Sequence, residues 1–123
     1  MKIMVVDDER DIEFLFRQQF RKETKEGLLE LYYAFSGEEA LQYLHAITPP
    51  DIVCILSDIN MPGMTGLDLL KIVKEQYPHI RVSMITAYGD EQNFNIAMST
   101  GAEHYFTKPI DFVQIKKDML NFT

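Results

Sequence analysis

Five polar side chains stand after short apolar runs of the chain, and their types could combine in one reactive site. They are Asp7, Asp8, Asp58, Thr86 and Lys108. Two unit charges about 4 Å apart repel by roughly 4 kcal/mol at an effective dielectric of 20, so three ionised acids in one cleft need a cation or raised pKa values. Oxygen ligands favour Mg²⁺ or Mn²⁺ over zinc. A divalent ion beside a lysine and a hydroxyl donor is typical of phosphoryl transfer.

The three acids differ in their sequence neighbours, which suggests different roles. Asp58 stands alone after the run Ile52–Leu56 and one serine, whereas Asp7 and Asp8 are adjacent. We therefore expect Asp58 to be the nucleophile and the adjacent pair to be metal ligands. Each residue taken alone is commonly a turn or cap residue, so the prediction depends on all five occurring together. The three histidines have no ligand spacing.

The elements that must position these residues follow a strict alternation. The apolar runs predict five strands at Lys2–Val6, Leu28–Phe35, Ile52–Leu56, Arg81–Ile85 and Glu103–Phe106. Helical spacing of apolar residues follows each run, and this alternation predicts an α/β fold with a parallel sheet covered on both faces. The strand order 2-1-3-4-5 is one common doubly wound solution for five units. It brings the first and third strand ends together, at the edge where such folds bind ligands.

The helices have predictable caps and inward faces. We expect Asp8 or Asp11 to cap the first helix and Gly27 to end it, and Ser36 with Glu39 to form a capping box on the second. The inward residues of these two helices are predicted to be Ile12, Leu15, Phe16, Phe20, Ala40, Leu41, Leu44 and Ile47.

The last two helices open at aspartates. Asp90 and Asp111 are the predicted N-caps. The predicted inward residues of these two helices are Phe94, Ala97, Met98, Gly101, Phe112, Ile115, Met119 and Phe122. The third helix carries Leu69, Leu70, Val73 and Tyr77.

Composition restricts the class of protein. The 123 residues fit one domain, residues 1–123, and 46% apolar with 25% charged residues is ordinary for a globular chain. The net charge of −7 disfavours direct nucleic-acid binding. No apolar run reaches the roughly 18 residues of a membrane span, and Lys2–Val6 does not have the form of a signal peptide. Cys54 is the single cysteine, which is consistent with a reducing, cytoplasmic setting.

Four motifs resemble the receiver domains of two-component response regulators, and the resemblance covers essentially the whole chain. They are Val5–Glu9, Ser57–Gly66, Ile85–Ala87 and Gly101–Pro109. The resemblance implies a CheY-like, flavodoxin-like (βα)5 fold. It also implies that Asp58 accepts a phosphoryl group from a histidine kinase or phosphotransfer protein.

The resemblance also implies a role for each site residue. Asp7 and Asp8 would hold Mg²⁺, with Asp58 and the backbone carbonyl of Asn60 as further ligands. Lys108 would neutralise the phosphate. The hydroxyl of Thr86 would form a hydrogen bond to the phosphate. Tyr105 would be the rotating aromatic, and Pro109 would be a proline preceded by a cis peptide.

The implied output surface consists of the helix that Asp90 opens, the strand Glu103–Phe106 and the helix that Asp111 opens. It would contact a downstream effector domain or protein, and it allows a homodimer. The chain would not be an enzyme with a separate substrate, because it promotes only its own phosphorylation and dephosphorylation. As a further hypothesis, Tyr88 shields the acyl phosphate from water.

Three other functions stay open at this point. A haloacid-dehalogenase-like, Mg²⁺-dependent phosphatase also uses an aspartate nucleophile, but it needs a second aspartate two residues later, where this chain has Asn60. A flavodoxin-like flavin binder needs a phosphate loop after the first strand, where this chain has Asp7–Glu9. The third alternative is an interaction module that is never phosphorylated.

Overall fold

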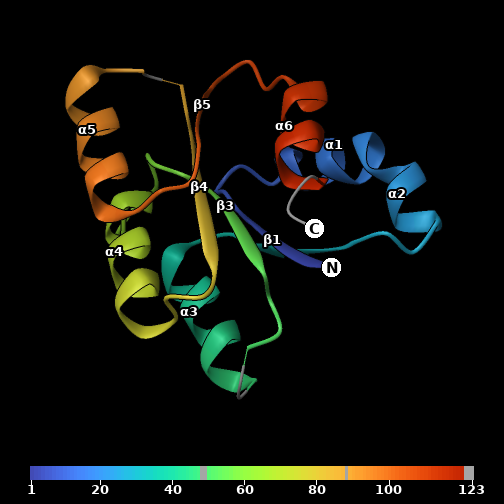
Figure 1. Cartoon of the computed structure of the whole chain (residues 1–123), viewed down its shortest axis with the longest axis horizontal. Helices are drawn as coiled ribbons and strands as arrows, with labels where there is room; N and C mark the ends of the chain where they lie inside the picture. The colour runs from blue at the N-terminus through green and yellow to red at the C-terminus, as the bar shows by residue number, and fades with distance from the viewer. Residues whose placement is uncertain (48–49, 88, 121–123) are drawn as a thin grey trace.

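The sheet has five parallel strands in the order β2-β1-β3-β4-β5, which confirms the predicted fold class. The computed structural model describes residues 1–47, 50–87 and 89–120. Along the chain the elements are β1 (Lys2–Val6), α1 (Asp11–Gln19), α2 (Arg21–Lys25), β2 (Glu30–Ala34), α3 (Gly37–Ala46), β3 (Cys54–Asp58), α4 (Gly66–Gln76), β4 (Arg81–Thr86), α5 (Glu91–Thr100), β5 (Tyr105–Thr107) and α6 (Phe112–Leu120). Figure 1 shows α1, α2 and α6 on one side of the sheet and α3, α4 and α5 on the other.

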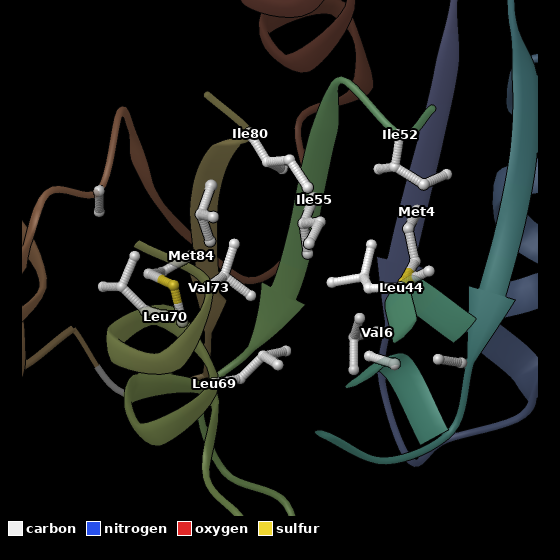
Figure 2. Packing of buried hydrophobic residues seen from close by; sticks show 14 of the residues in the cluster. Met4, Val6, Leu44, Ile52, Ile55, Leu69, Leu70, Val73, Ile80 and Met84 are labelled. Carbon is white, nitrogen blue, oxygen red and sulfur yellow. The ribbon is translucent and has the colours of Figure 1, made fainter. Parts of the chain in front are cut away.

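Two apolar cores follow from the alternation of side chains along the strands. In β1, Ile3 and Val5 join the core beneath α1 and α6, whereas Met4 and Val6 join the core beneath α3 and α4. Figure 2 shows the second of these cores, with Ile55 of β3 between Val73 of α4 on one side and Met4 of β1 and Leu44 of α3 on the other. All five residues of β3 are buried. A parallel strand covered on both faces needs such a continuous apolar run, which explains why periodicity of two is absent there.

The first helix is shorter than predicted and has no side-chain cap. Arg10 occupies the N-cap position without a capping hydrogen bond, so the prediction of Asp8 or Asp11 as cap is wrong. The helix ends at Gln19, and α2 begins after Phe20, whose φ of −103° and ψ of 16° are not helical. The break lets the buried ring of Phe20 stack on Phe16 at 5.8 Å. Tertiary packing of one aromatic therefore overrides a continuous helical pattern.

The strand boundaries also shift by one to two residues. The third strand was predicted at Ile52–Leu56, but β3 begins at Cys54 and includes Asp58, because its pairing with β4 runs from Cys54 to Asp58. Ile52 is buried outside the strand. Asp58 is therefore the last residue of a strand, and its backbone is paired in the sheet.

Helix α5 buries less of its surface than its sequence predicts. Asp90 is the N-cap, as predicted, and its carboxylate accepts a hydrogen bond from the N–H of Asn93 at 2.7 Å. Ala97 is the buried residue of this helix, but Phe94 is 45% exposed and Met98 is 39% exposed, so their inward assignment is wrong. Gly101 is exposed and ends the helix with φ of 113°. The neighbouring strand β5 has three residues, which leaves too little sheet to cover a wider face of the helix.

The other caps agree with the sequence in part. Ser36 accepts a hydrogen bond from the N–H of Glu39 at 3.0 Å, and Asp111 accepts one from the N–H of Gln114 at 3.1 Å. The reciprocal capping box is found at Thr65 of α4, a position that the sequence reading missed. Phe122 lies outside the described residues. Within the described chain, no helix is both long and apolar enough to cross a bilayer.

Candidate functional site

Strand register places the first and third strand ends side by side. Val6 of β1 pairs with Ser57 of β3. Asp7 follows Val6, and Asp58 follows Ser57. Both acids therefore lie at the carboxyl edge of the sheet, next to each other. The backbone N–H of Asp7 also donates to the carbonyl of Ala34 at 3.1 Å, which ties the turn after β1 to β2.

The fourth and fifth strands bring two further residues to the same edge. Thr86 is fully buried at the end of β4 and pairs with Thr107 of β5. The backbone N–H of Lys108 donates to the carbonyl of Thr86 at 2.8 Å. The peptide bond between Lys108 and Pro109 is cis. Lys108 therefore follows β5 at the same edge of the sheet as Thr86.

Three carboxylates converge in this cleft. One oxygen from each of Asp7, Asp8 and Asp58 lies within 4.8 Å of the others. Asp7 and Asp58 are buried, whereas Asp8 is exposed. The backbone N–H of Glu9 donates to Asp7 Oδ1 at 2.9 Å and orients that carboxylate. The donor set consists of hard oxygens, and this chemistry fits Mg²⁺ or Mn²⁺.

Lys108 places a cation between two of these acids. Its Nζ lies 3.4 Å from Asp7 Oδ2 and 3.8 Å from Asp58 Oδ1. The side chain of Lys108 is 20% exposed, and each of the two carboxylates is 6% exposed, so the three charges interact with little solvent between them. One cation among three acids leaves the cleft with a negative excess.

The pKa values of the two buried acids, Asp7 and Asp58, are raised in this negative environment. The pKa of Asp58 is raised to about 6, first by burial and then by the charge of Asp7, while the charge of Lys108 opposes both. Burial also raises the pKa of Asp7, against the hydrogen bond from Glu9 and the charge of Lys108. Burial alone lowers the pKa of Lys108, but the charges of Asp7 and Asp58 outweigh it, so the net pKa is raised. A bound divalent cation would relieve this repulsion.

The loop between β3 and α4 is held tightly to the strand. The N–H of Ile59 donates to the carbonyl of Ile85 at 3.1 Å, and the N–H of Gly66 donates to the carbonyl of Ile59 at 2.9 Å. A Cβ on Gly66 would lie 2.0 Å from the carbonyl oxygen of Asp58. Only glycine permits this approach. Asn60 lies in this loop and is exposed, and its role as a carbonyl ligand stays a prediction.

Glu38 of α3 is a contributor to this loop that the sequence reading missed. Its Oε1 accepts a hydrogen bond from the N–H of Met64 at 3.2 Å. A Cβ on Gly63 would lie 3.2 Å from the Oε2 of Glu38. Gly63 also has φ of +74°, a conformation that favours glycine. The two partners are 26 residues apart in sequence, so no local pattern signals the contact.

The predicted switch residues lie beside the cleft. Tyr105 pairs with Met84 in the sheet and is half-buried. Its ring meets that of Phe94 edge to face, with centroids 5.3 Å apart and an interplanar angle of 68°. Burial raises the pKa of the Tyr105 hydroxyl. Tyr88, the predicted shield of the acyl phosphate, lies outside the described residues.

Comparisons with known proteins agree with this geometry. A model of the response regulator receiver domain family matches residues 3–120. The sporulation initiation phosphotransferase F of Bacillus subtilis is 36% identical over 117 residues, which is 94% of this chain and 87% of that protein. The DNA-binding transcriptional regulator NtrC of Proteus hauseri is 41% identical over 109 residues. This match covers 89% of this chain but 22% of that protein, so the chain spans about a fifth of the second relative.

A solved structure has the same fold. A chain of the CheX-CheY complex from Borrelia burgdorferi, solved with BeF3 and Mg²⁺, superimposes with a TM-score of 0.85 at 28% sequence identity. The match covers 98% of this chain and 87% of that chain. Because the family model matches nearly the whole sequence, the chain belongs to the response regulator receiver domain family.

Proposed function

We propose that this chain is the phosphoacceptor switch of a two-component phosphorelay, with Asp58 as the residue that is phosphorylated. The observation that carries the proposal is the position of Asp58. It is buried at the end of β3, beside two further acids and 3.8 Å from the ammonium of Lys108. With a pKa of about 6, it is mostly ionised at neutral pH and can act as a nucleophile.

The proposed metal is Mg²⁺, with Mn²⁺ as a substitute. Asp7, Asp8 and Asp58 would hold it, together with the backbone carbonyl of Asn60. When bound, the ion supplies positive charge that neutralises phosphoryl oxygens. The supporting observation is the convergence of three carboxylate oxygens within 4.8 Å, two of them on buried residues.

The proposed transfer takes the phosphoryl group from a histidine of a kinase or phosphotransfer protein. A carboxylate oxygen of Asp58 forms a bond to phosphorus, and the bond between phosphorus and the donor imidazole nitrogen breaks. The electron pair of that bond stays on the nitrogen, so a ring protonated on its other nitrogen leaves as neutral imidazole. Lys108 stabilises the added negative charge on the phosphoryl oxygens.

The switch would follow from the charge added at Asp58. Phosphorylation adds acceptor oxygens that attract the hydroxyl of Thr86 and the ammonium of Lys108. Movement of the loop after β4 then changes the space available to the ring of Tyr105. A single local charge change can bias such a two-state element. We propose no reaction on a separate substrate, because the chemistry ends on Asp58.

The proposed output surface is formed by α5, β5 and α6. It would bind a downstream effector domain or protein, or a second copy of the chain. The exposed side chains of Phe94 and Met98, one turn apart on α5, support this proposal, because exposed apolar groups close together mark contact sites. The net charge of −7 supports an output without direct nucleic-acid contact. We place residues 1–123 in one receiver domain with a cytoplasmic location.

The haloacid-dehalogenase-like phosphatase is not favoured. Its general acid would stand at residue 60, where this chain has an exposed asparagine, which cannot donate a proton in that role. An interaction module that is never phosphorylated leaves the raised pKa of Asp58 and the half-buried Lys108 without a function.

The experiment that tests the function is mass spectrometry after incubation with acetyl phosphate and Mg²⁺. We expect the mass of one phosphoryl group to be added, and the addition to be lost in Asp58→Ala. No added mass, or an addition that survives Asp58→Ala, would overturn the proposal. Glu75→Gln, at an exposed site on α4, is the matched control and should be phosphorylated normally.

A further inference from the structure

A groove lies between the α1–α2 segment and β2, outside the acidic cleft. It is lined by Arg17, Arg21, Thr24, Lys25 and Leu31 and has a volume of about 350 Å³. A second hollow of about 330 Å³ adjoins it, because both include Arg17 and Arg21. We call the two together the α1–α2 groove. In Figure 1, α1 and α2 lie at the opposite end of the molecule from α5, whereas α6 lies beside α1. The residues that line the groove come from α1, α2 and β2, and not from the proposed output surface of α5, β5 and α6.

The charge of this groove opposes that of the rest of the chain. The chain has 12 Lys and Arg residues and a net charge of −7. Four of the 12 cations fall within residues 17–25: Arg17, Arg21, Lys22 and Lys25. The single acid in this segment, Glu23, faces away from the groove and pairs with Lys116 of α6 at 3.1 Å. Across residues 1–47, 50–87 and 89–120, no carboxylate lies within ion-pairing distance of Arg21 or Lys25.

Arg17 is held in place before any partner arrives. Its Nη2 lies 2.7 Å from Glu13 Oε2, and its Nε donates to the same oxygen at 3.0 Å. Its guanidinium also lies 4.9 Å from the ring centroid of Tyr33. The charge of Arg17 is therefore already paired with Glu13. Arg21 and Lys25 are the lining cations that have no ion pair among the described residues, so they are the ones assigned to a ligand carboxylate.

The groove also offers apolar contacts. Leu31 of β2 is a half-buried lining residue, and Phe14 at the far end of the groove is 72% exposed. A run of cations on a helix is ordinarily a solvated face, but here the cations border a hollow with apolar residues at both ends. A pocket of about 300 Å³ or more is large enough to enclose several side chains of a ligand.

We propose that the α1–α2 groove binds an acidic segment of a partner polypeptide, with carboxylates on Arg21 and Lys25 and apolar side chains on Leu31 and Phe14. Charge complementarity carries the choice of partner. A duplex nucleic acid or an anionic membrane is an extended negative surface, and a chain of net charge −7 is repelled from it as a whole. A short acidic segment contacts the basic groove alone, so it avoids most of that repulsion.

The test uses a fluorescently labelled peptide of alternating glutamate and leucine, with fluorescence anisotropy as the measure of binding. The groove variant is Arg21→Glu with Lys25→Glu, and the control variant is Lys71→Glu with Arg81→Glu, which makes the same charge change at exposed sites on α4 and β4. We expect the dissociation constant to rise at least about tenfold in the groove variant and to stay within about twofold in the control. Binding should weaken as salt approaches about 0.15 M.

The milder pair Arg21→Ala with Lys25→Ala keeps the test valid if charge reversal perturbs folding, and circular dichroism checks both variants. Equal weakening in the groove and control variants would overturn the proposal, as would the absence of saturable binding at low salt. Tighter binding of a phosphatidylserine vesicle or a single-stranded oligonucleotide than of the peptide would assign the groove to a different partner and overturn the choice made here. Phosphorylation of Asp58 is not required, so these outcomes are independent of the proposed switch.

Discussion

The ammonium of Lys108 lies 3.8 Å from Oδ1 of Asp58, with Asp7 Oδ2 at 3.4 Å on its other side. Among the groups that lower the pKa of the buried Asp58 carboxyl, Lys108 has the largest effect. Two strands that are not sequence neighbours bring the pair together, since Asp58 ends β3 and Lys108 follows β5.

Removal of this cation should therefore raise the pKa of Asp58 above its value of about 6. In Lys108→Ala we expect phosphorylation from acetyl phosphate at pH 7 to slow by roughly 10²-fold, because the phosphoryl oxygens lose a fixed positive partner. Carbon NMR of the carboxyl group and the initial rate of phosphoryl incorporation measure the two effects. Lys117→Ala on α6 is the control. An unchanged pKa would show that Lys108 does not control Asp58.

The raised pKa of Asp58 also predicts how stability depends on pH without divalent ions. The folded carboxyl, with a pKa of about 6 against an ordinary 3.8, binds its proton more tightly than the unfolded one. Stability should therefore fall as pH rises from about 4 to about 6, by up to about 3 kcal/mol. Asp58→Asn should be more stable than the parent chain by about 2 to 3 kcal/mol above pH 6, and equal to it below pH 4.

Urea unfolding at a series of pH values, in the presence of a chelator, measures this difference. Glu75→Gln on α4 is a neutralising change at an exposed site and should show no such window. A stability gain in Asp58→Asn that is the same at pH 4 and pH 7 would mean that packing, and not ionisation, is responsible.

The metal proposal predicts opposite effects of one substitution with and without the ion. Asp8→Asn removes an exposed acid from the cluster, so without Mg²⁺ it should leave stability unchanged or slightly higher. The parent chain should gain about 2.7 kcal/mol at Mg²⁺ concentrations 100 times the dissociation constant. The variant should need at least about tenfold more Mg²⁺ for the same gain.

Thermal unfolding across a Mg²⁺ titration reads out both effects. The matched control is Glu26→Gln, an exposed acid at the end of α2. If the melting temperature of Asp8→Asn rose at the same Mg²⁺ concentrations as that of the parent chain, the proposed ligand set would be wrong.

Gly66 should tolerate no side chain. A Cβ added at residue 66 would lie 2.0 Å from the backbone oxygen of Asp58. This oxygen belongs to the main chain and cannot rotate away as a side-chain atom could. We expect Gly66→Ala to cost about 3 kcal/mol or more and to displace Asp58. Gly27→Ala, with φ of +76° but nothing within 4 Å, should cost only about 1 kcal/mol from its backbone conformation. Urea unfolding compares the two, and equal costs would mean that the close approach is not what requires glycine at residue 66.

Glu38 is expected to be a positioning residue for the loop that carries Asn60. Because its Oε1 accepts from the N–H of Met64, Glu38→Ala should weaken Mg²⁺ binding by roughly tenfold with a loss of only about 1 kcal/mol in stability. Glu38→Gln keeps the acceptor oxygen and should restore the affinity. Calorimetric titration with Mg²⁺ tests this, with Glu39→Ala as the neighbouring control, and failure of glutamine to restore binding would show that the charge matters and not the hydrogen bond.

Local pattern was sufficient for the alternation of strands and helices and for the membership of the acidic cluster, whereas the strand order is fixed by the pairing in the sheet. The five apolar runs each became a strand, and the acids that follow β1 and end β3 meet because parallel strands share a carboxyl edge. Predictions that depended on the extent of packing were less accurate. Phe94 and Met98 have helical spacing with Ala97, yet both are exposed, because the three-residue strand β5, whose Tyr105 contacts Phe94, is too short to cover this face of α5.

The sequence by itself determined the alternation of strands and helices, because apolar spacing and capping residues act over a few neighbouring positions. It also determined which residue types could hold a cation and accept a phosphoryl group. Only the tertiary structure decided the break at Phe20, the contact of Glu38 with Met64, and the basic groove between α2 and β2. Each of these depends on packing or contacts between segments that are distant in the chain, and such contacts leave no periodic signal in the sequence.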